Sequence, residues 1–124
     1  MQPIKVLETP YSPEINLDKE RSRFEFFGKS FPEDAKEFYN PIIDWFRQYV
    51  VEPNRETIVH FKLDYFNTAS SKKLVDILNI LKEIHKQKKT IIIHWYYRTN
   101  DDDMLETGET FSEIVNLPFK FFPY

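Results

Sequence analysis

The spacing of hydrophobic positions changes along the chain, and each period predicts a type of element. The N-terminal quarter holds three short alternating runs, at residues 4–7, 15–17 and 21–28, which predict strands. Residues 9–14 contain two prolines, which cannot continue the interior of a sheet. Phe24 and Phe26 fall on one face of the third run. The region is therefore predicted to form a strand meander at a sheet edge.

The next segment shows helical periodicity. Its apolar positions recur every three or four residues and are Phe38, Ile42, Trp45, Phe46 and Tyr49. Ser30 and Glu33 have the spacing of a capping box with a proline between them. A first helix is therefore expected from Ser30 to about Val51. Pro41 lies inside this segment and either kinks the helix or marks a restart after Asn40, and a kink is favoured.

A strand is predicted at 57–66, with Val59, Phe61, Leu63 and Tyr65 on one face. A second amphipathic helix follows to about Lys88, and its apolar period begins at Leu74.

The β-branched and aromatic run at 90–97 predicts a central strand buried on both faces. Residues 101–103 are three aspartates, which predict the start of a weaker third helix. The apolar positions of this helix are Met104, Leu105, Phe111, Ile114 and Val115. Residues 117–122 predict a last short strand.

After the meander, helices and strands alternate, which favours crossover connections and a partly parallel sheet. The predicted fold class is α/β, a mixed sheet with an N-terminal strand meander and about three helices. The 124 residues fit one domain spanning 1–124.

Composition removes several classes of function. The net charge of −3 argues against a nucleic-acid-binding protein. The absence of cysteine excludes disulfides, thiol catalysis and thiolate metal sites, and suits the cytoplasm. No apolar run approaches ~18 residues, so no membrane span or membrane partner is expected.

The turn at residues 67–73 is the main candidate site. Thr68 lies where a strand gives way to a helix, and two roles remain open for it. It can cap the helix, or it can accept a phosphate at the positive end of the helix dipole. Ser70 and Ser71 are alternative caps or acceptors. Lys72 and Lys73 are cations that can pair with an added phosphate.

Other candidate chemistry is weak. His60, His85 and His94 lack the spacing of helical metal ligands. Residues 101–112 do not match a calcium loop, because the sixth position is Glu106 instead of glycine and the twelfth is Ser112 instead of glutamate. With only two glycines, no phosphate-cradling loop is expected. Taken together, these observations predict no cofactor, no metal and no catalytic constellation. Six lysines between Lys72 and Lys89 suggest either a basic strip on the second helix or simple solvation of that face.

Four blocks of the chain resemble the SiaC family of bacterial biofilm-regulating phosphoproteins. They lie in family order along nearly the whole chain, at residues 31–45, 63–78, 94–97 and 111–119. The resemblance implies a STAS-like domain similar to anti-sigma-factor antagonists, with reversible phosphorylation at Thr68.

The resemblance also implies partners. These are a Ser/Thr kinase of the anti-sigma-factor type, a PP2C-type phosphatase and a diguanylate cyclase of cyclic-di-GMP signalling. The residues expected to contact partners are Asn67, Thr68, Ser70, Ser71, Lys72 and Lys73. The resulting hypothesis is a non-enzymatic, phosphorylation-switched adaptor. Its rivals are a small enzyme or ligand-binding domain with an aromatic pocket, and an oligomerising structural protein.

Overall fold

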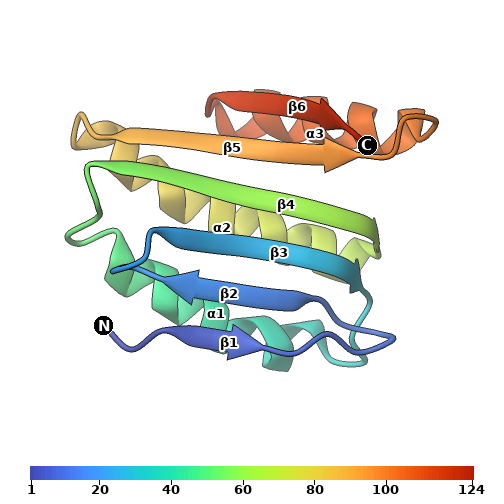
Figure 1. The fold of residues 1–124 in the computed structure, drawn as a ribbon, viewed down its shortest axis with the longest axis horizontal. Coiled ribbons are helices and arrows are strands. Elements are labelled where there is room, and N and C mark those ends of the chain that lie inside the picture. The colour runs from blue at the N-terminus through green and yellow to red at the C-terminus, as the bar shows by residue number, and fades with distance from the viewer.

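A computed structural model describes residues 1–124 as one six-stranded sheet and three helices (Figure 1). The strands are β1 (Ile4–Val6), β2 (Glu14–Asp18), β3 (Arg23–Ser30), β4 (Glu56–Phe66), β5 (Thr90–Tyr97) and β6 (Phe119–Pro123). The helices are α1 (Ala35–Tyr49), α2 (Thr68–Lys86) and α3 (Asp102–Val115).

The strands lie side by side in the order in which they occur in the chain. β1, β2 and β3 form an antiparallel meander, whereas β3 to β6 are parallel to one another. Each parallel pair is joined through a helix, and all three helices lie behind the sheet in Figure 1. The predicted mixed α/β sheet with its N-terminal meander is confirmed, and the molecule has two layers.

The core forms between the sheet and the helices. One apolar side chain from each strand stands in a single row across the sheet, and neighbours in this row are register partners. The row is Val6, Ile15, Phe26, Phe61, Trp95 and Phe121. The rings of Phe26 and Phe61 stack at 4.7 Å between centroids. The row belongs to one hydrophobic core that includes the buried faces of all three helices.

The prediction that β5 is buried on both faces is wrong. Ile91, Ile93 and Trp95 are fully buried, but the alternate residues of the strand are only half-buried. The reason is the one-sided placement of the helices, which leaves the second face of the sheet uncovered (Figure 1). Tyr65 also departs from expectation: it lies near the end of β4 and its side chain is 52% exposed.

The predicted start of the first helix is also wrong. Ser30 is the last residue of β3, where it pairs with Phe66 and is fully buried. Asp34 is the cap instead, because its side chain accepts a hydrogen bond from the Glu37 backbone N–H at 3.0 Å. The helix then runs through Pro41 without a break, and Pro41 itself is exposed.

The two later helices differ from the predictions in detail. Asp101 caps α3 as predicted, accepting from the Met104 N–H at 3.0 Å. Ile114, expected in the core, is 59% exposed. The lysines do not form a basic strip along α2, because Asp76 and Glu83 lie between them on the exposed face.

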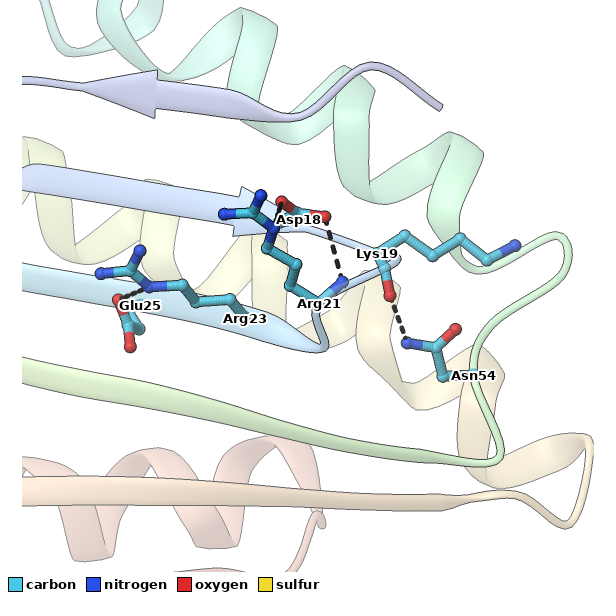
Figure 2. A network of polar contacts seen from close by, with 6 residues as sticks. All are labelled: Asp18, Lys19, Arg21, Arg23, Glu25 and Asn54. Carbon is cyan, nitrogen blue, oxygen red and sulfur yellow. Dashed lines mark hydrogen bonds and ion pairs between the residues drawn. The ribbon is translucent and has the colours of Figure 1, made fainter.

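Polar contacts join the β2–β3 turn to the loop that precedes β4, at the end of the sheet where β4 begins (Figure 2). Asn54, in the loop after α1, donates to the Lys19 carbonyl in the β2–β3 turn at 2.8 Å. On β3, the Arg23 guanidinium donates to the Glu25 carboxylate at 2.7 Å. No helix is both long and apolar enough to cross a bilayer.

Candidate functional site

The Thr68 turn joins the end of β4 to α2. The Asn67 N–H donates to the Ser30 carbonyl at 3.1 Å, which fixes the turn to the neighbouring strand β3. Asn67 has extended backbone angles, and its side-chain oxygen accepts from the Ser70 N–H at 2.9 Å. Asn67 is therefore the helix cap, and the expectation that Thr68 caps the helix is wrong. Asn67 comes directly before Thr68 and has the extended backbone that a cap residue needs.

Thr68 is the first helical residue, and its side chain is exposed. No side-chain hydrogen bond of the structure involves its hydroxyl, since the cap bond is made by Asn67. The first N–H groups of any helix lack intrahelical acceptors, and the helix dipole is positive at this end. The first turn of α2 carries no acidic residue, whereas those of α1 and α3 do. The local field around the Thr68 hydroxyl therefore favours an anion.

Ser70 has a structural role. It is fully buried, and the Ser30 hydroxyl donates to its Oγ at 2.8 Å. The Ser30 oxygen also bonds the buried Tyr39 hydroxyl of α1. The expectation that Ser70 contacts partners is therefore not supported, because its hydroxyl lies inside the domain. This buried chain of hydroxyls connects β3, α1 and α2 directly beneath the Thr68 turn.

Burial raises the pKa of the Tyr39 hydroxyl to about 12, and its hydrogen bonding with Ser30 and Ser70 only partly opposes this shift. The protonated hydroxyl is the form that the fold requires, because it donates to Ser30 while Ser30 donates to Ser70.

Thr68 lies on the edge of an open groove of about 1040 Å³ between the three helices. The lining residues come from the start of α1, the first two turns of α2 and the end of α3. They are Glu33, Asp34, Ala35, Lys36, Thr68, Ala69, Ser71, Lys72, Lys73, Val75, Asp76, Phe111 and Ile114.

The groove therefore brings together four of the expected site residues, namely Thr68, Ser71, Lys72 and Lys73. It adds residues that sequence reasoning missed. Lys36 and Glu33 are distant in the chain, and nothing in their local sequence links them to Thr68. Ile114 looked like a core position from its helical spacing.

The groove is electrically balanced and partly apolar. Three lysines and three acidic residues line it, and Lys73 approaches Asp76 at 4.0 Å. No group of three or more potential metal ligands occurs in the structure. The groove thus presents charged and apolar side chains together, and the exposed Thr68 is one of its lining residues.

Together, the fold and the site define a small two-layer α/β protein with an exposed threonine at the start of α2. The chain belongs to the SiaC family of regulatory phosphoproteins, whose family model matches residues 6–124. It is similar to an uncharacterized protein of Pseudomonas aeruginosa strain UCBPP-PA14, with 29% identity over 96% of this chain and 94% of that protein.

Solved structures show the same fold. Apo-SiaC from Pseudomonas aeruginosa is 29% identical and superposes with a TM-score of 0.90, covering 98% of this chain and 99% of that one. SiaC from the same organism has also been solved in complex with the diguanylate cyclase SiaD, which it activates. That SiaC chain is 28% identical, with a TM-score of 0.90 over 98% of this chain and 99% of that one.

The assignment of the cap predicts a difference between two neighbouring substitutions. Asn67→Ala should lower the free energy of unfolding by about 0.5–2 kcal/mol, because the Ser70 N–H loses its acceptor. Thr68→Ala should change it by less than about 0.5 kcal/mol, because the hydroxyl makes no internal bond. Urea melts of both variants measure this. Equal losses in the two variants would contradict the assignment.

The buried hydroxyl chain predicts a dependence on alkaline pH. The folded-state pKa of Tyr39 is raised to about 12 from 10.0. Its contribution is therefore fully present below pH 10 and is lost as the pH rises through 12. The loss should reach about 2–3 kcal/mol of unfolding free energy.

Tyr39→Phe has no ionisable hydroxyl, so the stability gap between wild type and this variant should narrow between pH 10 and 12. Denaturant melts across this range measure the gap. Tyr11→Phe is the control, because Tyr11 is 61% exposed. A gap that stays constant with pH would show that Tyr39 ionises normally.

Proposed function

We propose that this protein is a non-enzymatic adaptor whose binding is switched by reversible phosphorylation of Thr68. One observation carries the proposal: the Thr68 hydroxyl is exposed and free of internal bonds, at a helix start on the edge of a groove. A kinase can reach such a hydroxyl without unfolding the turn. Ser70, the nearest alternative, is fully buried.

The mechanism is electrostatic. A phosphate adds about −1.5 to −2 charges at neutral pH. The groove has equal numbers of lysines and acidic residues, so the modification converts a balanced surface into an anionic one. The helix dipole and Lys72 stabilise the phosphate where it stands. The fold itself need not change, because Asn67 and Ser70 keep their bonds.

The output partner is proposed to be a diguanylate cyclase, by analogy with the Pseudomonas aeruginosa relative solved in complex with one. The exposed Ile114 and the half-buried Val75 give the groove an apolar strip to bury against that partner. Unmodified protein is the binding form in this proposal. A phosphate at the rim would have to be desolvated in the interface, at a cost of several kcal/mol.

The proposal includes two further enzymes. A Ser/Thr kinase of the anti-sigma-factor type adds the phosphate from ATP, and a PP2C-type phosphatase removes it. Because ATP is the donor, the cycle belongs in the cytoplasm. The match to a family of regulatory phosphoproteins supports an adaptor rather than an enzyme.

The acceptor is tested by phosphorylation in vitro. Incubation with the kinase and ATP should add one phosphate to the peptide that contains Thr68, as read by mass spectrometry. Thr68→Ala should abolish it, whereas the matched control Ser71→Ala, one helical turn along the same groove, should keep it. A phosphate on Ser71 of the wild type would overturn the assignment.

The switch is tested by binding to the cyclase. Phosphorylated protein should bind the diguanylate cyclase at least tenfold more weakly than unmodified protein, about 1.4 kcal/mol. Ile114→Lys should also weaken binding of the unmodified protein, because it removes the apolar contact. Lys86→Glu lies beyond the groove and serves as a control. Equal affinity of both phosphorylation states, measured by titration calorimetry, would contradict the switch.

A further inference from the structure

The uncovered face of the sheet carries the second surface of interest, on the side opposite the helices (Figure 1). One polar side chain from each strand stands in a row across it, and neighbours are again register partners. The row is Lys5, Asn16, Glu25, His60, His94 and Lys120. The β4–β6 half of this face is only partly solvated.

The half-buried side chains on β4, β5 and β6 form a cluster. The rings of His60 and His94 lie 5.0 Å apart between centroids, and His94 lies 4.8 Å from Phe122. Tyr96 stacks on Phe122 at 5.2 Å, and its hydroxyl bonds His60 Nδ1 at 2.9 Å. The His60 and His94 rings meet edge to face, whereas Tyr96 and Phe122 are stacked, so the four rings pack against one another. This arrangement suits contact with another protein surface better than stacking of nucleic-acid bases.

The distribution of residue types on this face is self-complementary. A two-fold axis parallel to the strands, midway between β4 and β5, would place β4 over β5 of a second copy and β3 over its β6. Register partners at equal height then face each other. Ile58 meets Ile92 of the second copy, and His60 meets His94 of the second copy, because both pairs are in register within one sheet.

The charged residues follow the same symmetry. Glu25 on β3 and Lys120 on β6 share the same row, so each carboxylate faces the ammonium of the other copy. Asp64 and Arg98 form an ion pair of 2.9 Å within one chain, and the Tyr124 hydroxyl donates to Asp64 at 2.8 Å. No like charges oppose one another among these residues. An axis one strand further toward β1 would instead place Lys5 over Lys120.

We propose that the uncovered sheet face is a homodimer interface, in which two copies pack sheet to sheet about this axis. The arrangement is isologous, since every contact occurs twice, and it corresponds to aligned packing of two twisted sheets. It leaves the Thr68 groove free, because the groove lies on the helical layer. The inference is independent of the proposed phosphorylation switch.

The size of the face sets the expected affinity. Four strands spaced ~4.8 Å apart and four residue pairs of ~6.8 Å give a footprint of about 500 Å² per copy. The total of about 1000 Å² is at the lower limit for specific interfaces. The dimer should therefore be reversible, with a dissociation constant on the order of 10–100 µM.

Charge reversal tests the axis. Sedimentation velocity from about 5 µM to about 1 mM should show wild-type protein passing from monomer to dimer. Lys120→Glu should weaken the dimer at least tenfold, because it places two carboxylates opposite each other in each of two symmetric contacts. Glu25→Lys should do the same. The double variant should recover affinity to within about threefold of wild type.

The control is Lys86→Glu, the same charge change on the helical layer, which should leave the dimer unchanged. Because Glu25 also bonds Arg23 and Asn16, thermal midpoints must confirm that Glu25→Lys is folded. A second measurement needs no variant: on dilution, amide chemical shifts should change along β3–β6 and not along the helices.

If the wild-type protein stays monomeric at about 1 mM, the homodimer proposal is wrong, and the uncovered face would then be a contact surface for a different protein. Shift changes confined to the helices, or a Lys120→Glu variant that dimerises like wild type, would overturn it equally.

Discussion

Six apolar side chains, one from each strand, stand side by side across the sheet and face the helices, and the whole structure depends on that row. It runs from Val6 through Phe26, Phe61 and Trp95 to Phe121. Moving any strand by one residue would turn its apolar set to solvent and a polar side chain of the opposite row into the core. The register that fills the core therefore also determines the polar row on the opposite face. Both faces of the sheet follow from a single constraint.

The same register places the Thr68 turn. Because β3 and β4 end together, the Ser30 carbonyl accepts from the Asn67 N–H, and the Ser30 hydroxyl reaches Ser70. Tyr39 of α1 completes this buried chain. Each buried hydroxyl has a partner, so no unsatisfied polar group offsets the packing. The turn is fixed by Asn67 and Ser70 on either side of Thr68, which leaves the threonine free for chemistry without a role in the fold.

The two-layer architecture separates two surfaces. The groove lies among the helices, and the imidazole and aromatic cluster lies on the far side of the sheet. The proposed phosphate on Thr68 would alter the charge of the helical layer, while the uncovered face of the sheet would keep its contacts. A small protein of this form can engage two molecules at once, because neither surface overlaps the other.

The sequence by itself determined the alternation of strands and helices, the mixed sheet and the position of the Thr68 turn, because these depend on local period and turn chemistry. Residues 57–66 and 68–86 carry periods long enough to be unambiguous. The resemblance to the SiaC family, visible in the blocks around Thr68, also came from sequence. Only the tertiary structure decided which of the polar residues near a helix start caps the helix, which is buried and which is exposed.

Ser30 has the spacing of a cap and Thr68 stands before a helical period, yet Asp34 and Asn67 are the caps. Ser30 and Ser70 are buried because β3 and α2 meet above Tyr39, a contact between residues 40 positions apart. Whether β5 is covered on one face or two depends on the side to which all the crossover helices pass. These outcomes rest on long-range contacts, which local spacing does not encode.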